Sequence, residues 1–156
     1  MHQLDETEIQ ILQLLQNDAS LSSGEIAERI RSSQSPVWRR INNLEKSGII
    51  KKKVALLDAK KLGFGIEVFV RVKMSEHGRH TLSEFEQAIC KFPQVQECQL
   101  LLGEIDFRLR VIAKNLDDYE EFLRLHLMQM KGVREIASSV VVRNVKDTRN
   151  IPLEML

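Results

Sequence analysis

The sequence has few of the residues that build disulfide-rich or metal-bound scaffolds. Its 156 residues include two cysteines and three prolines. Two cysteines are too few for a disulfide framework, and the separation of eight between Cys90 and Cys98 matches no zinc spacing. We therefore expect reduced thiols, and we interpret both cysteines as small packing residues rather than a reactive pair.

Long apolar runs are also missing. No stretch approaches the ~20 apolar residues that span a bilayer, and the opening MHQLDETEIQ lacks a basic segment followed by an apolar one. With 43% hydrophobic and 29% charged residues, the composition is typical of an ordinary globular protein. The sequence predicts no membrane partner and a cytoplasmic location.

Catalytic and metal-binding groupings are not evident. The four histidines lie in unrelated segments, and no serine, histidine and acid combination or glycine-rich phosphate loop is present. His77 and His80 could meet at a strand-to-helix junction, but a surface loop is the preferred interpretation there. We expect no enzyme activity, no catalytic residue, no metal and no cofactor.

Charge is nearly balanced over the whole chain, at +1, but it is unevenly distributed. Residues 1–30 contain one basic and six acidic residues, whereas residues 31–53 contain seven basic residues and one acidic residue. A basic block confined to one local structure is typical of a surface that binds polyanions.

Capping patterns predict short helices in the first fifty residues. Asp5 with Glu8, and Ser22 with Glu25, each form a capping-box pattern before apolar residues at helical spacing. A third helix begins after Ser33 and ends at Gly48. Three short helices with a basic third one predict a helix-turn-helix, and the segment IIKKKVALLD, residues 49–58, is expected to form a wing or exit strand.

The third helix places Val37, Ile41 and Leu44 on an inward face. The outward and flanking positions have side chains that suit a DNA groove, because Arg and Asn contact base edges while Ser and Lys contact phosphates. A solvated helix is the alternative, and for Trp38 packing against the first helix and a contact to the DNA backbone remain equally open. The candidate DNA-binding residues are Gln34, Ser35, Trp38, Arg39, Asn42, Asn43 and Lys46.

The second half has a different periodicity. Residues 64–74 alternate apolar and polar side chains, which predicts a half-buried strand. A helix ending before Pro93, two strands (95–102 and 105–113), a helix from Asn115 to Gly132 and a last strand (133–145) follow. The order β-α-β-β-α-β predicts an α+β, ferredoxin-like sandwich with both helices on one sheet face. Phe69, Ile112 and Val141 on the other face favour pairing between subunits.

Three stretches resemble the Lrp/AsnC family, the leucine-responsive and asparagine-synthetase regulators of bacteria and archaea. LDETEIQILQLLQNDASLS resembles the opening helix of the family, SPVWRRINNLEKSGII its recognition helix with Arg40 before an aliphatic residue, and GEIDFRLRV its glycine-x-x-aspartate strand. WRRINNLE, VALLDAKKLGFG and RNIPLE are most similar to the branch that includes a cysteine-responsive activator. Ala137 departs from the family, in which a hydroxyl residue is common.

The resemblance implies double-stranded DNA, a small amino-acid effector and further copies of the chain as partners. Family members bind DNA as dimers, often four to a ring, and take the effector at the contact between dimers; Arg40 joins the DNA-binding set. A carboxylate for the effector's ammonium and backbone N–H groups for its carboxylate would suit this role, although Gly103 and Asp106 are also plain turn residues. The implied effector-binding residues are Leu102, Gly103, Glu104, Asp106, Ser138 and Ser139.

These expectations define three segments: a winged helix-turn-helix domain (1–50), a linker strand (51–63) and a ferredoxin-like effector-binding and oligomerisation domain (64–156). The preferred function is a sequence-specific, effector-responsive transcriptional regulator associated with the nucleoid. Two alternatives remain: an amino-acid-sensing regulatory subunit of a metabolic enzyme, for which the C-terminal sandwich would suffice, and an architectural DNA-binding protein without an effector. The basic helix disfavours the enzyme subunit.

Overall fold

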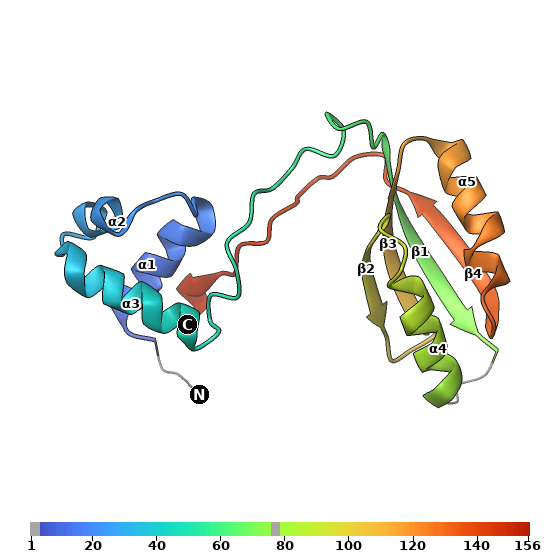
Figure 1. Cartoon of the computed structure of the whole chain (residues 1–156), viewed down its shortest axis with the longest axis horizontal. Coiled ribbons are helices and arrows are strands. Elements are labelled where there is room, and N and C mark those ends of the chain that lie inside the picture. Colours follow the sequence, from blue (N-terminus) through green and yellow to red (C-terminus); the bar gives the residue numbers. More distant parts are fainter. Residues whose placement is uncertain (1–3, 76–78) are drawn as a thin grey trace. The chain divides into compact units, whose positions relative to one another are not determined.

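The structure is a computed structural model that describes residues 4–75 and 79–156. It contains two compact units, one formed by Met1–Leu56 together with Lys146–Leu156 and the other by Leu57–Val145 (Figure 1). The expected division assigned all of 64–156 to the second domain. The last eleven residues instead belong to the first unit, because Leu153 is buried in its core.

The first unit is built from three helices, α1 (Glu6–Asn17), α2 (Ser23–Arg29) and α3 (Gln34–Lys46). Both predicted capping boxes are confirmed, with Asp5 and Ser22 accepting the backbone N–H of the residue three positions on. Ser33 is the N-cap of α3, but its side chain makes no capping hydrogen bond. The inward residues of the three helices form a common apolar core together with Leu153; the helical members are Ile11, Leu12, Leu15, Ile26, Ala27, Val37, Ile41 and Leu44.

The segment after α3 differs from the prediction. Residues 49–58, expected as a wing or exit strand, form no strand, and neither does any other part of the expected linker strand 51–63. A strand needs a partner for its backbone hydrogen bonds, and no strand pairs with this segment in the described chain.

The second unit has the predicted β-α-β-β-α-β order. Its elements are β1 (Ile66–Met74), α4 (Arg79–Ile89), β2 (Val95–Leu100), β3 (Phe107–Ala113), α5 (Leu116–Leu125) and β4 (Val133–Val140). The sheet order is β2-β3-β1-β4 with every pair antiparallel, so β2 and β4 are the edge strands.

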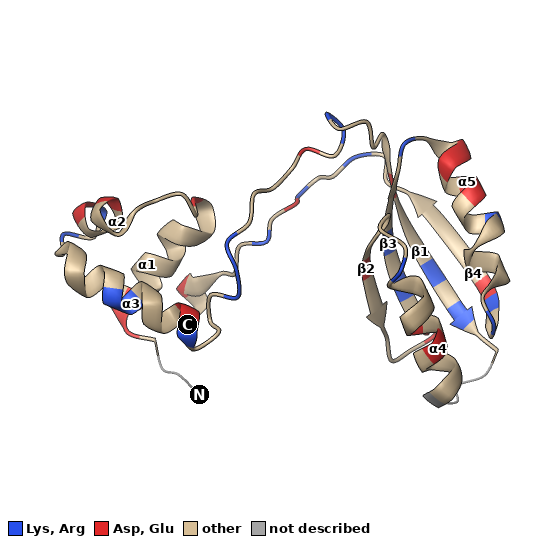
Figure 2. Ribbon diagram, viewed as in Figure 1, with Lys and Arg blue, Asp and Glu red and all other residues tan. Residues whose placement is uncertain are grey.

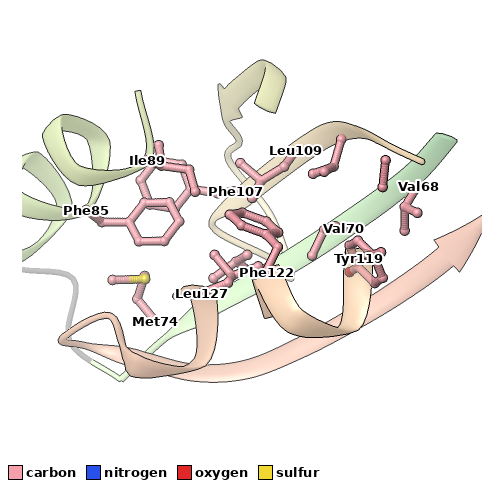
Figure 3. Packing of buried hydrophobic residues seen from close by; sticks show 13 residues of the cluster. Val68, Val70, Met74, Phe85, Ile89, Phe107, Leu109, Tyr119, Phe122 and Leu127 are labelled. Atoms are coloured by element: carbon pink, nitrogen blue, oxygen red, sulfur yellow. The ribbon is translucent and has the colours of Figure 1, made fainter. Parts of the chain in front are cut away.

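The core of this unit lies between the two helices and one face of the sheet (Figure 3). Alternate residues of β1 and β3 are buried there, beginning with Val68 and Phe107, as the period of two requires. Phe85 of α4 contacts the Phe107 ring, with centroids 4.5 Å apart.

Two boundaries differ from those expected. The helix predicted to reach Gly132 ends at Leu125 and is followed by a short 3-10 turn, Leu127–Gln129, which buries Leu127 completely. The last strand, expected to run to residue 145, ends at Val140, which pairs with Val68 near the beginning of β1. Val141 makes a final hydrogen bond to the Glu67 carbonyl at 2.8 Å.

Candidate DNA-binding and effector sites

Helix α3 presents its polar residues away from the core of the first unit. Ser35, Arg39, Asn43 and Lys46 are exposed, and Asn42 is half-buried. Ser35, Arg39, Asn42 and Lys46 are spaced by three or four residues and therefore share one helical face. Figure 2 shows the basic residues of this helix and of the segment that follows it. The face combines the side-chain types that contact bases and phosphates.

The two neighbouring arginines have different surroundings. The Arg40 guanidinium is paired with the carboxylate of Asp5, the N-cap of α1, and lies 3.9 Å from Glu8. The Glu8 N–H and the Arg40 guanidinium together lower the pKa of Asp5. Arg39 is exposed and has no ion-pair partner among the residues described. Arg40 therefore ties α3 to α1, whereas Arg39 is available to a ligand.

The N-terminal half of α3 borders a shallow hollow of about 620 Å³, lined by Gln34, Ser35, Pro36, Trp38 and Arg39. Trp38 is 60% exposed, so it does not pack into the core of the unit. Gln34 donates to the Ser23 hydroxyl at 3.4 Å and so contacts α2.

Four of the predicted effector residues, Leu102, Gly103, Glu104 and Asp106, lie in the loop between β2 and β3. Leu102, Gly103 and Glu104 are exposed. The Asp106 carboxylate accepts the Met74 N–H at 2.7 Å, and the Asp106 N–H donates to the Val72 carbonyl at 3.0 Å. Asp106 thus fixes the loop to the end of β1.

The two predicted serines point to opposite sheet faces. Ser138 pairs with Val70, whose side chain is on the helix-covered face, and its hydroxyl lies 2.5 Å from the Tyr119 hydroxyl of α5. Ser139 pairs with Phe69 and is on the open face. Burial raises the pKa of Tyr119, although its hydrogen bond with Ser138 acts in the other direction. Sequence periodicity gave no sign of Tyr119 as the Ser138 partner, because an inward tyrosine on α5 is indistinguishable from a core residue.

One chain does not bring the loop and the serines together. The loop joins β2 to β3, and β1 separates β3 from β4. Two strand spacings correspond to about 10 Å. Ser138 and Ser139 also pair with the middle of β1, whereas the loop contacts its end.

The open sheet face is more polar than the sequence indicated. Phe69 is half-buried beneath the Arg108 guanidinium, 5.0 Å from its ring centroid, and Arg110 lies 3.0 Å from both Glu67 and Glu97. Burial alone would raise the pKa of Glu67, but hydrogen bonds from Arg110 and Asn144 hold it below its ordinary value. The sequence signal that could have predicted these paired charges is the charged residues at alternate positions of the strands, such as Arg108 and Arg110 in β3.

The ligand-binding unit has a hollow of about 340 Å³ that lies away from the predicted effector residues. It is lined by Phe64, Pro93, Gln94, Gln96, Val111, Ile112, Ala113, Lys114, Asp118, Tyr119 and Phe122. These residues gather at the far end of β3 from the Gly103 loop.

Both cysteines are free thiols, but only one is packed. Burial raises the pKa of Cys98 to about 11, with smaller contributions from Cys90 and Glu86. Cys90 is exposed, so its interpretation as a packing residue was wrong.

Within 4–75 and 79–156, no group of three or more His, Cys, Asp or Glu side chains could hold a metal ion. In the same part of the chain, no helix has the length and apolar character needed to cross a membrane. The suggested meeting of His77 with His80 involves a residue, His77, that lies outside the described residues.

Comparison with known proteins agrees with both halves of the chain. Residues 4–51 match the winged helix-turn-helix DNA-binding family, and residues 67–151 match the Lrp/AsnC ligand binding domain. The transcriptional regulator AzlB of Bacillus subtilis is 38% identical over 97% of this chain and 96% of its own. The transcriptional activator DecR of Escherichia coli K12 is 32% identical over 97% of this chain and 99% of its own.

Solved structures include one of very similar fold. The transcriptional regulator NMB0573 of Neisseria meningitidis, crystallised as an L-Met complex, has a TM-score of 0.94 at 33% identity, covering 99% of this chain and 100% of its own. An AsnC family transcriptional regulator of Agrobacterium tumefaciens has a TM-score of 0.92 at 30% identity, covering 98% and 99%.

A helix-turn-helix unit with a basic third helix, joined to a ferredoxin-like ligand-binding unit, defines a DNA-binding transcriptional regulator. The chain belongs to the Lrp/AsnC family, as its sequence predicted. No observation favours the enzyme-subunit or architectural alternatives.

Proposed function

We propose that this regulator binds a small amino acid at a site completed by two copies of the chain. The observation that supports this is the separation of the Gly103 loop from Ser138 and Ser139 within one chain, by at least two strand spacings. If both groups contact one effector, they come from different copies. Assembly as dimers, and as an octamer of four dimers, would provide such contacts.

The loop offers the chemistry that an amino acid requires. Glu104 is an exposed carboxylate that can pair with an ammonium group. The N–H groups of Gly103 and Glu104 donate to no other group in the described part of the chain and can bind a carboxylate. Leu102 is fully exposed and can contact an apolar effector side chain.

For the DNA-binding site, we propose that the exposed face of α3 enters the major groove. Arg39, Asn42 and Asn43 would contact base edges, while Ser35 and Lys46 would contact phosphates. Trp38 and Gln34 would flank the groove, and Arg40 would act through its tie to α1.

The relatives are transcriptional regulators, and we infer the same role, without enzyme activity, for this chain. A cytoplasmic location with nucleoid association follows from that role. NMB0573 was crystallised with L-Met, whereas the name of AzlB, which is more similar to this chain in sequence, specifies no effector.

Calorimetric titration of the twenty amino acids, followed by DNA-binding isotherms with and without the one that binds, tests the proposal. The DNA is a duplex selected from a random library by the wild-type protein. Gly103→Val should abolish the response while leaving basal affinity within a few fold, because its side chain would occupy the approach to a loop that lies outside the DNA-binding unit. An added Cβ meets nothing within 4 Å, but the φ of 158° strains any residue other than glycine, so thermal unfolding must show that the variant is folded. The coupling free energy should fall by about 1 to 3 kcal/mol.

Asp106 needs a matched pair of variants. Asp106→Asn keeps an acceptor for the Met74 N–H and removes the charge, whereas Asp106→Ala removes both. A response abolished in both variants indicates that the charge contacts the effector, while a response abolished only in Asp106→Ala indicates a structural role. A wild-type protein that binds no amino acid at millimolar concentration would contradict the proposal.

A further inference from the structure

The C-terminal segment is attached to helix α1 of the DNA-binding unit by a side-chain clamp. The Gln16 amide donates to the Ile151 carbonyl at 3.1 Å and accepts the Ile151 N–H at 3.0 Å. Asn150 donates to the neighbouring Asn17 side chain at 2.7 Å. One side chain of α1 therefore holds both the N–H and the carbonyl of Ile151.

Apolar burial adds to the clamp. Leu153 is 7% exposed and belongs to the core that α1, α2 and α3 share, whereas the following Met155 and Leu156 are about four-fifths exposed. A short 3-10 turn, Leu153–Met155, directs one side chain inward and leaves the next outward. The segment is therefore a component of the DNA-binding unit.

The same segment is continuous with β4 of the ligand-binding unit. Ser138 and Ser139 lie in β4, and the strand leaves the sheet at Val141, whose N–H is bonded to Glu67. Asn144 donates to the Glu67 carboxylate at 3.2 Å. Residues 140–149 therefore connect the predicted effector contacts on β4 to the point where the chain joins α1.

This topology gives the DNA-binding unit two covalent connections to the ligand-binding unit. One leaves after α3, and the other returns from β4 to α1. A single flexible connection transmits little of the free energy of effector binding to the DNA-binding helices. Coupling between two sites requires an element with two arrangements, whose equilibrium is shifted by ligands at both sites. A segment that is either seated on α1 or released is such an element.

We propose that residues 150–155 form a strap that couples effector binding on β4 to the DNA-binding helices through its seating on α1. This rests on the effector function proposed above. Release of the strap leaves α3 intact and both covalent connections in place, but it removes the contacts with α1 through which the second connection acts on the DNA-binding helices.

Two substitutions with matched controls test the strap. Leu153→Ala removes its buried anchor, and Met155→Ala makes a comparable truncation at an exposed position two residues on. Gln16→Ala removes the clamp, and Gln13→Ala removes the same amide one turn earlier on α1, where no hydrogen bond of the side chain is found among the described residues. Gln16→Ala leaves the apolar core untouched and keeps the test valid should Leu153→Ala fold poorly.

Operator affinity is measured for the full-length proteins with and without each of the twenty amino acids, using the duplex selected by the wild type. We expect the controls to respond like the wild type, by about fivefold or more. In Leu153→Ala and Gln16→Ala the response should fall to less than about twofold while basal affinity stays within a few fold, and amide exchange in α1 should be faster.

Three results would overturn the strap. The first is an undiminished response in Gln16→Ala and Leu153→Ala, and the second is a loss of basal DNA binding together with unfolding of both, which would make the segment purely structural. The third is a wild-type protein whose DNA binding no amino acid changes; only this result also removes the proposed effector function, so the two failures are distinguishable.

Discussion

Adjacent residues on one helix can have unrelated tasks, as Arg39 and Arg40 do. Successive positions on an α-helix are about 100° apart, so neighbours in the sequence face different surroundings. Arg40 is turned toward the acidic N-terminus of α1, where its charge is neutralised by Asp5. Arg39 is directed into solvent beside Trp38.

Replacing these arginines one at a time should separate their roles. Arg39→Ala should weaken DNA binding by about tenfold and reduce the salt slope by about 0.9 for each phosphate that it no longer neutralises, with no change in melting temperature. Arg40→Ala should lower the melting temperature, because it leaves Asp5 and Glu8 without their cation. Thermal unfolding and DNA-binding isotherms at two salt concentrations measure both effects.

The control for the arginine experiment is Arg134→Ala, which removes the same charge from an exposed position on β4. It should leave DNA affinity nearly unchanged. Normal binding by Arg39→Ala would mean that the outward face of α3 does not contact DNA.

At the scale of elements, the junction before β4 depends on Gly132. Its φ of 83° lies in the left-handed region, and its carbonyl accepts the Ser75 N–H at 2.7 Å at the end of β1. A Cβ added there would lie 2.5 Å from Thr81 Cγ2 and 3.1 Å from Met74 Cε. Both backbone conformation and close packing therefore require glycine at this position.

Gly132→Ala should destabilise the ligand-binding unit by about 2 to 4 kcal/mol, from left-handed strain of about 1 kcal/mol and overpacking of about 1 to 3 kcal/mol. Gly63→Ala is the matched control, because Gly63 also has a positive φ but an added Cβ would meet nothing within 4 Å. Its cost should be about 1 kcal/mol. Chemical denaturation compares them, and equal costs would show that Thr81 and Met74 move aside freely.

At the scale of the whole molecule, the ligand-binding unit is inserted between two parts of the DNA-binding unit. Its core is complete within residues 57–145, since both helices and all four strands belong to it. Its open sheet face combines a half-buried aromatic ring with a ladder of paired charges. Such a face suits a specific contact with another copy, because the paired charges can be covered without being left unsatisfied.

A fragment of residues 57–145 should therefore unfold cooperatively and associate without the DNA-binding unit. Size-exclusion chromatography with light scattering should give a mass at least twice that of the fragment. Arg110→Ala, which leaves Glu67 and Glu97 without their shared cation, should weaken the association. A folded fragment that stays monomeric would show that the first unit is needed for assembly.

Local physical chemistry determined much of this protein from its sequence alone. The capping boxes at Asp5 and Ser22, the inward face of α3, and the period of two in β1 and β3 depend on neighbouring residues, so they were predictable. The order of elements then limited the second half to a ferredoxin-like sandwich. The Lrp/AsnC family followed from the same stretches.

Tertiary structure decided the features that depend on residues far apart in the chain. Three contacts join segments that are distant in the sequence, so no local pattern could predict them. They are the pairing of Arg40 with Asp5, the hydrogen bond between Ser138 and Tyr119, and the burial of Leu153 in the core of the first unit. Strand order likewise decided that β1 separates the Gly103 loop from the β4 serines, because pairing between strands, rather than sequence distance, sets which side chains meet.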